Sequence, residues 1–295
     1  MNHYKLASAL FAGLLAFGLS AHAADTKAVD PVADQVSKIP CSTCHADLVK
    51  DYVKGHHGNL HNTKAPGNDC ASCHGETLRH MSNPVKEKPQ FSFKLDKQGF
   101  MDEKSRAESD KVCTSCHKDA EKKHWAGSAH QRAGLACVSC HNNHKPDISI
   151  NKKTSTAQCL SCHQEMKADL FKTSTHPLLD GQMNCVSCHN PHGTKAGGEA
   201  LMKKQTVNET CFTCHPGKRG PFVHPHQPVT ENCANCHNPH GSNKAPMLKA
   251  RGDQLCMSCH RNAHMREPAR KVGCTSCHTA IHGSNAPTQG DKLIH

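Results

Sequence analysis

The sequence has too few large apolar residues to build an ordinary hydrophobic core. Its 295 residues include 18 Leu, 5 Ile, 13 Val and 8 Phe, with one Trp and two Tyr. Leu, Ile, Val and Phe together are fewer than one residue in six, and chains below roughly 20% are prone to disorder. We therefore expect the polypeptide alone to remain unfolded, with something other than side chains forming its interior.

Long apolar runs are also missing, except at the amino terminus. Lys5 precedes an apolar run of fourteen residues from Leu6 to about Leu19, and Ala21-His22-Ala23 forms an A-x-A cleavage site. This run is too short to span a bilayer, which takes about 20 residues. We expect residues 1–23 to be a signal peptide and residues 24–295 to form one mature domain outside the cytoplasm.

No cysteine is left over for a structural disulfide, because all 20 lie in ten copies of Cys-x-x-Cys-His. A zinc ribbon gives no role to a histidine directly after the second cysteine. A thioredoxin-like dithiol occurs once in a βαβ setting, and a disulfide framework would not repeat the histidine. Covalent attachment of haem c explains every feature, since two cysteines form thioethers and the histidine ligates the iron.

The motifs predict ten haem c groups, and these apolar plates would supply the missing core. The attachment residues are Cys41, Cys44, Cys70, Cys73, Cys113, Cys116, Cys137, Cys140, Cys159, Cys162, Cys185, Cys188, Cys211, Cys214, Cys233, Cys236, Cys256, Cys259, Cys274 and Cys277. The proximal iron ligands are His45, His74, His117, His141, His163, His189, His215, His237, His260 and His278.

The formal net charge of +11 does not indicate nucleic-acid binding. Each haem carries two propionates, so ten haems offset the excess of lysine and arginine. We interpret the basic residues as propionate partners and as solubilising surface.

The motifs form five pairs, which predicts five di-haem repeats at about 41–80, 113–144, 159–192, 211–240 and 256–282. Repeat arrays are usually elongated. The expected fold is therefore an elongated, mostly irregular multihaem cytochrome with short α-helices and minimal β-structure. We expect a short helix at each motif and a longer one around Ala46–Lys54. Residues 91–96 would form a short strand or hairpin, or a lid over a haem, and residues 283–295 a flexible tail.

Each repeat also supplies histidines outside its motifs, at least one between the two motifs and one after the second. The following histidines are His80, His144, His192, His240 and His282. Between the motifs, His176 and His264 are the single choices in their repeats. The other repeats offer His56, His57 or His61, then His124 or His130, and then His224 or His226. One of each kind per repeat would give every iron a second imidazole ligand.

The stretch NCANCHNPHG at 232–241 shows why these ligands should cross between haems. His240 lies only three residues from His237, so it cannot easily reach the opposite face of the same porphyrin. Ligation of a neighbouring haem is expected instead, although the sequence does not say which. Methionine is the rival ligand, but Met81, Met247, Met257 and Met265 do not recur in register.

Irons held by two imidazoles have no open coordination position, which favours electron transfer over catalysis. A multihaem reductase would need an unusual motif or a missing distal histidine. Two settings fit an electron carrier. It would be a soluble periplasmic shuttle, or a conduit that crosses the outer membrane inside a partner barrel, because its polar surface could not face lipid.

The sequence resembles the decahaem cytochromes of the MtrA/DmsE/PioA type over nearly the whole mature chain. The matching stretches are Ser174-Thr-His-Pro-Leu, CVSCHNPHG at 185–193, KRGP at 218–221, PVTENCANCHNPHG at 228–241, QLCMSCH at 254–260 and Ile281-His-Gly-Ser-Asn, together with Trp125 five residues before His130. The resemblance also implies that His57, His130 and His226 are the ligands where a choice exists.

The same resemblance implies a location and partners. It implies a periplasmic haem wire associated with the outer membrane and partly inserted in a β-barrel porin. A periplasmic or inner-membrane cytochrome would donate electrons. An extracellular multihaem cytochrome or other terminal reductase would receive them for metal or dimethyl-sulfoxide reduction, and phototrophic members run the wire inward.

Overall fold

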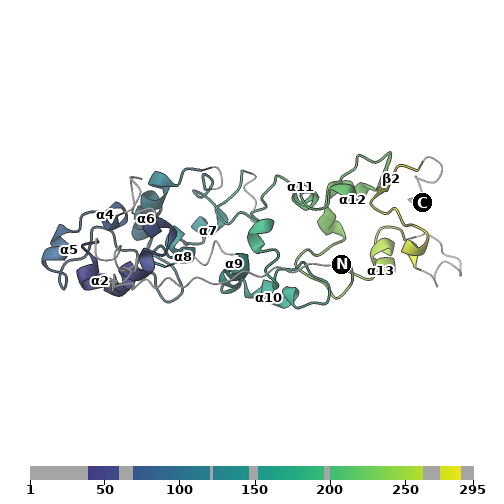
Figure 1. The fold of residues 1–295 in the computed structure, drawn as a ribbon. Coiled ribbons are helices and arrows are strands. Elements are labelled where there is room, and N and C mark those ends of the chain that lie inside the picture. Colours follow the sequence, from purple (N-terminus) through teal and green to yellow (C-terminus); the bar gives the residue numbers. More distant parts are fainter. Residues whose placement is uncertain are drawn as a thin grey trace, which may run out of the picture.

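The computed structural model describes residues 39–59, 69–119, 122–145, 152–195, 200–261 and 273–286. They form an elongated body along which the chain advances in sequence order, from α2 and α5 at one end to α13 and β2 at the other (Figure 1). The expected signal peptide, the boundary at residue 24, His61, His264 and Met265 lie outside the described residues.

The elements are short helices joined by irregular segments, as expected. The α-helices are α2 (Ser42–Tyr52), α3 (His56–Asn59), α4 (Cys70–His74), α5 (Leu78–Ser82), α6 (Glu103–Cys116), α7 (Ala129–Arg132), α8 (Cys137–Cys140), α9 (Lys152–Leu160), α10 (Gln164–Leu170), α11 (Val207–Phe212), α12 (Gln227–Glu231) and α13 (Gly252–Met257). The 3-10 helices are η3 (Cys185–Ser187), η4 (Pro216–Lys218), η5 (Cys233–Asn235) and η6 (Cys274–Ser276). None of the helices in these ranges is long and apolar enough to cross a membrane.

Every motif lies on or beside one helical turn. Cysteines at positions i and i+3 and a histidine at i+4 project from one face of such a turn, so one haem can meet all three. In nine motifs the backbone N–H of the histidine donates to the carbonyl of the first cysteine, for example from His117 to Cys113 at 3.0 Å and from His215 to Cys211 at 2.9 Å. Polar caps start several of these helices. Asp69 accepts from Ser72 N at 2.7 Å, and Thr206 from Glu209 N at 3.1 Å.

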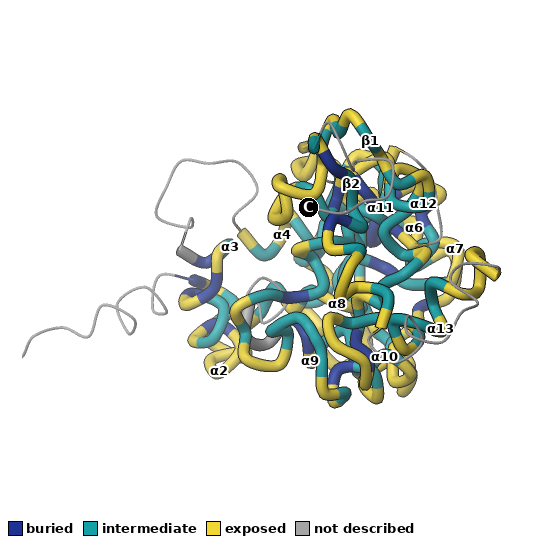
Figure 2. The backbone as a smooth tube through the Cα atoms, turned by 90° about the vertical axis from the view of Figure 1, so that its right-hand side faces the viewer, coloured by how far each residue is buried: buried dark blue, intermediate teal, exposed yellow. Residues whose placement is uncertain are grey.

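The apolar interior of the polypeptide is as sparse as the composition predicts. Nine hydrophobic residues are buried across the described ranges. Three of them, Ile39, Val49 and Val53, form a cluster against Cys41 and Cys70. Elsewhere the buried residues occur singly or in short runs between exposed ones (Figure 2). No continuous side-chain core joins the two ends of the described body.

Two local predictions about secondary structure are wrong. Residues 91–96 form no strand, because Phe91 N–H donates to the carbonyl of His74 rather than to another strand. Phe93 instead packs on the His74 ring, with ring centroids 5.4 Å apart, which resembles the lid alternative. The flexible tail expected at residues 283–295 is wrong at its start, where strand β2 (Gly283–Ser284) pairs antiparallel with β1 (His224–Pro225); residues 287–295 lie outside the described residues. The longer helix expected near residues 46–54 is confirmed as α2.

Candidate haem sites

The two motifs of each repeat meet through their first cysteines. Side-chain contacts join Cys41 to Cys70, Cys113 to Cys137, Cys159 to Cys185, Cys211 to Cys233 and Cys256 to Cys274. Burial and the neighbouring thiol raise the pKa of Cys70 to about 12 and that of Cys211 to about 11. In two other pairs one thiol shifts the opposite way: contact with Cys159 lowers the pKa of Cys185 to about 7, and contact with Cys137 lowers the pKa of Cys113. The paired thiols are therefore close enough to perturb each other's ionisation.

Consecutive repeats also approach each other through cysteines. The charge of Cys113 acts on Cys73, and that of Cys140 acts on Cys159. That charge is present only when the acting thiol is ionised, and it then raises the pKa of its neighbour; Cys211 would affect Cys188 and Cys259 would affect Cys236 in the same way. The ten motifs thus follow one another in chain order as a track of paired cysteines along the body.

Nine motif histidines each face a histidine from outside the motifs. The ring centroids are 5.8–6.4 Å apart. The pairs are His45–His80, His74–His144, His117–His57, His141–His192, His163–His130, His189–His240, His215–His176, His237–His282 and His260–His226.

The spacing within these pairs fits a single metal ion between two imidazoles. Two metal–nitrogen bonds of about 2 Å each, with the half-width of a ring added on either side, give a centroid separation of about 6 Å. Within the described ranges, no three Cys, His, Asp or Glu side chains converge as metal ligands. Two axial ligands, with the remaining positions filled by a porphyrin, match this donor set.

Hydrogen bonds fix the ring nitrogen that would face the iron. Nδ1 of His130, His176 and His226 lies 2.9–3.0 Å from the carbonyl oxygen of Pro191, Pro239 and Ile281, respectively. A carbonyl only accepts, so Nδ1 carries the proton and Nε2 is left for the metal. Each of these carbonyls belongs to the residue before a following histidine. In two of the three cases this residue is the proline of a repeated Pro-His step, and in the third it is Ile281; sequence reasoning did not identify these carbonyls as hydrogen-bond acceptors.

Burial favours the neutral form of several of the following histidines. Desolvation lowers the pKa of His144, His240 and His282, and nearby basic groups add to the effect, although Asp169 opposes it at His240. A neutral imidazole is the form that binds a metal. The environment of these three rings therefore favours the protonation state needed for ligation.

The facing pairs follow one rule along the array. A second-motif histidine faces the following histidine of the next repeat, as His141 faces His192. A first-motif histidine faces the between-motif histidine of the previous repeat, as His163 faces His130. The exception is the first repeat, in which His45 faces His80 of its own repeat. Adjacent repeats are thereby interlocked by two histidine pairs at each junction.

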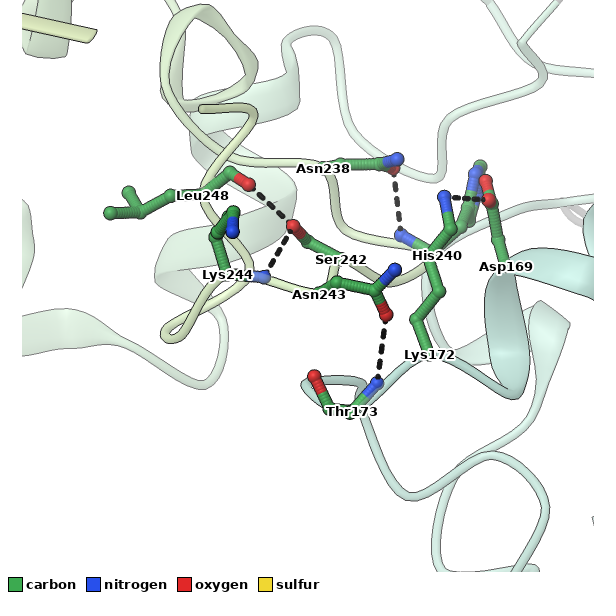
Figure 3. Close-up of polar contacts among 9 residues, drawn as sticks. All are labelled: Asp169, Lys172, Thr173, Asn238, His240, Ser242, Asn243, Lys244 and Leu248. Atoms are coloured by element: carbon green, nitrogen blue, oxygen red, sulfur yellow. Dashed lines mark hydrogen bonds and ion pairs between the residues drawn. The ribbon is translucent and has the colours of Figure 1, made fainter. Parts of the chain in front are cut away.

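The junction between the third and fourth repeats shows how the backbone positions such a histidine (Figure 3). His240 N–H donates to Asn238 Oδ1 at 3.3 Å, which fixes the turn that carries the ring. Thr173 N–H donates to Asn243 Oδ1 at 3.5 Å across the junction (Figure 3). A bridge between Ser174 and Ser242 extends this contact.

Gly241 permits the close approach at the same junction. Its φ is +144°, and a Cβ atom there would lie 2.1 Å from the carbonyl oxygen of Asp169. Only glycine fits this contact without a shift of the backbone. The glycine of the HNPHG stretch is therefore a packing requirement between repeats.

The structure separates the histidines among which the residues alone left a choice. His57, His130 and His226 face motif histidines. No such ring contact involves His56, His124 or His224 in the part of the chain that the structure describes. The partner of His278 falls outside the described ranges if it is His264.

Comparisons with known proteins place the chain among multihaem cytochromes. The doubled CXXCH motif family matches residues 176–220 and 226–265. The chain is also 40% identical over 270 residues to the multihaem cytochrome MtrA of Shewanella baltica (strain OS185), an alignment that covers 84% of this chain and 78% of that protein. The paired motifs support covalently bound haem c, and the fold of short helices agrees with such a cytochrome. The chain therefore belongs to the MtrA family of multihaem c-type cytochromes, which are electron-transfer proteins and not enzymes.

Proposed function

We propose that the chain binds ten haem c groups, each iron held by two histidines, and conducts electrons along the array. The nine facing histidine pairs carry this proposal, because each has the spacing of two axial ligands. The cysteines of the ten motifs supply the attachment points. When bound, the haems supply the one-electron chemistry, while the chain sets their order, orientation and surroundings.

The tenth iron would take His264 as its distal ligand to His278. Within the five repeats, the rule of the array assigns neither His264 nor His278 to another histidine, which leaves the two for each other. The first repeat offers a parallel, because its His80 faces His45 of the same repeat rather than a histidine of another repeat.

Spacing in the sequence supports the same assignment. His80 lies six residues after the second motif of its repeat, whereas the other following histidines lie three or four residues after theirs. His264 lies four residues after His260, whereas the facing between-motif histidines lie 11 to 13 residues after the preceding motif histidine. The two irregular spacings thus fall on the two histidines that would close the ends of the array.

The cysteine track supports conduction along the long axis. Because thioether attachment fixes the edge of each porphyrin at its cysteines, contacting cysteines bring neighbouring haem edges together. Contacts within repeats alternate with approaches between them, from Cys41 to Cys274. An electron would therefore pass through all ten haems in chain order.

We further propose that this wire works at the outer membrane. It would take electrons from a periplasmic or inner-membrane cytochrome and deliver them through a β-barrel porin to an extracellular multihaem cytochrome or terminal reductase. The supporting observations are the similarity to MtrA and the elongated body, which suits a narrow sheath (Figure 1). A soluble periplasmic shuttle is the alternative, favoured by the low mean hydropathy of the chain, −0.66.

Co-purification from membranes tests the location. The tagged holoprotein would be isolated from a gentle detergent extract of outer membranes, and the captured proteins identified by mass spectrometry. Stoichiometric recovery of an outer-membrane barrel supports the conduit. Recovery of the cytochrome only in the soluble periplasmic fraction, without a barrel, would favour the shuttle.

A further inference from the structure

A buried carboxylate lies at the haem attachment site of the second repeat. Asp110 is 7% exposed and lies in the last part of α6, three residues before Cys113. Its Oδ2 accepts the indole N–H of Trp125 at 2.6 Å, and Trp125 is itself 8% exposed. Its Oδ1 lies 3.3 Å from both the N and the Sγ of Cys137. Asp110 thus contacts the attachment residue of the fourth motif directly.

The same unit also reaches an iron-facing histidine. The Trp125 ring packs edge-on against His192, with centroids 6.5 Å apart. His192 faces His141, the histidine of the fourth motif. Asp110 therefore touches one side of this haem site through Cys137 and supports the other side through Trp125.

The equivalent position in the fourth repeat makes the same contact to a cysteine N–H without the charge. Asn208 lies three residues before Cys211, is 7% exposed, and accepts the Cys233 N–H on Oδ1 at 2.7 Å. Its Nδ2 donates to the carbonyl oxygens of Val229 and Thr230. The backbone contact that either residue makes can therefore be met by a neutral amide, and it does not require a carboxylate.

The other repeats do not share the buried charge either. Thr156 occupies this position in the third repeat and is buried. Asp253 occupies it in the fifth, but its side chain is 38% exposed and paired with Arg251. Among the positions described, Asp110 is the one buried carboxylate at this point of the repeat.

A buried negative charge has a defined effect on a neighbouring redox centre. It stabilises the more positive ferric form relative to the ferrous form, and the low effective dielectric strengthens the interaction. The field of Asp110 already acts on this site. After contact with Cys113 and burial, Asp110 is a further cause that raises the pKa of Cys137.

We propose that Asp110 sets a lower reduction potential for the haems at Cys113 and Cys137 than Asn208 allows at Cys211 and Cys233. The inference rests on the proposed function, because it requires haem at these cysteines. It adds that the repeats are electrically unequal, with a potential step between the second and fourth. Trp125 is the positioning residue, since its N–H orients the carboxylate.

Reciprocal substitutions test this directly. D110N removes the charge and keeps an oxygen acceptor for the Cys137 N–H, but its amide nitrogen cannot accept the Trp125 N–H. N208D places a charge at the matched position and removes the donor to the Val229 and Thr230 carbonyls. Each holoprotein would be titrated potentiometrically and followed by visible absorbance, with haem content and low-spin spectrum measured on the same sample. One unit charge at this range should change the reduction equilibrium constant of the nearest haem about tenfold, or about 59 mV for a one-electron couple.

The two variants should shift the reduction potentials of a few haems in opposite directions and leave the rest of the titration curve unchanged. D110N should raise the potential of one or two haems, and N208D should lower one or two. If both variants hold ten low-spin haems and titrate exactly as the wild type does, the inference is overturned while the proposed function stands. If D110N does not fold, an unshifted N208D decides against the inference by itself. Wild-type protein with missing or high-spin haems would instead contradict the proposed function.

Discussion

The pair His224 and His226 offers the sharpest mutational test of the ligand assignment. The two residues are separated only by Pro225, yet they have different surroundings. His226 faces His260 at 6.2 Å with an interplanar angle of 26°, and its Nδ1 donates to the Ile281 carbonyl at 2.9 Å. His224 is half-buried in β1 and has no such ring partner among the described residues. H226A and H224A are therefore matched variants.

The magnitude of the effect follows from one site in ten. H226A should convert about one tenth of the haem to a five-coordinate, high-spin form, because one of ten irons loses its second imidazole. It also removes one hydrogen bond, worth about 1 kcal/mol in stability. H224A should leave every haem low-spin. The haem count should be unchanged in both, since no cysteine is altered.

The assay is room-temperature magnetic circular dichroism, which separates high-spin from low-spin haem, with haem content measured by pyridine haemochrome. A high-spin fraction in H224A but not in H226A would reverse the assignment. Fully low-spin spectra in both variants would show that neither histidine is needed, and the ligation rule would be refuted.

Three further predictions address other parts of the array. H264A should leave the His278 iron high-spin by the same assay, again about one tenth of the haem, whereas an entirely low-spin spectrum would remove His264 as the end ligand. Electron paramagnetic resonance should resolve two classes of low-spin haem. The imidazole planes cross at 87° at the His117 site, three sites have planes 4–14° apart, and the other five facing pairs lie between these limits at 23–60°. The near-perpendicular and near-parallel sites define the two classes, and a single uniform class would contradict these angles. G241A should destabilise the holoprotein by about 1–3 kcal/mol in chemical denaturation, since the new Cβ would meet a carbonyl at 2.1 Å. G217A should be near neutral, because nothing lies within 4 Å of its Cβ position. Equal stability of the two variants would contradict the close packing of Gly241 at the junction between repeats.

The chemistry of the site was predictable because each attachment motif consists of five consecutive residues. Two cysteines and a histidine on one helical turn need no tertiary information, so the attachment residues follow from the motif alone. The expected fold of short helices in an elongated body is confirmed. It was predictable because the repeated motifs indicate an array and the chain has too few apolar residues for an ordinary core. The prediction that His240 serves a neighbouring haem rather than that of His237 agrees with its position opposite His189.

The partner of each histidine was not predictable, because it depends on contacts between repeats. His192 and His141 are 51 residues apart, and nothing in either motif specifies their meeting. Residues 91–96 failed as a strand for a similar reason. Their alternation suits a sheet, but the Phe91 N–H donates to the His74 carbonyl and Phe93 packs on the His74 ring instead. The sequence alone does not predict a role for Asp110, since its burial and its hydrogen bond from Trp125 form only in the folded chain.

The central claim is that every iron of the array is held by two imidazoles. Near-infrared magnetic circular dichroism of the oxidised holoprotein, calibrated to haem content and protein mass, measures this most directly. The account predicts ten haems per chain, all with the charge-transfer band of bis-histidine ligation. Fewer than ten haems, or a band from methionine, thiolate or five-coordinate iron in the wild-type protein, would contradict it.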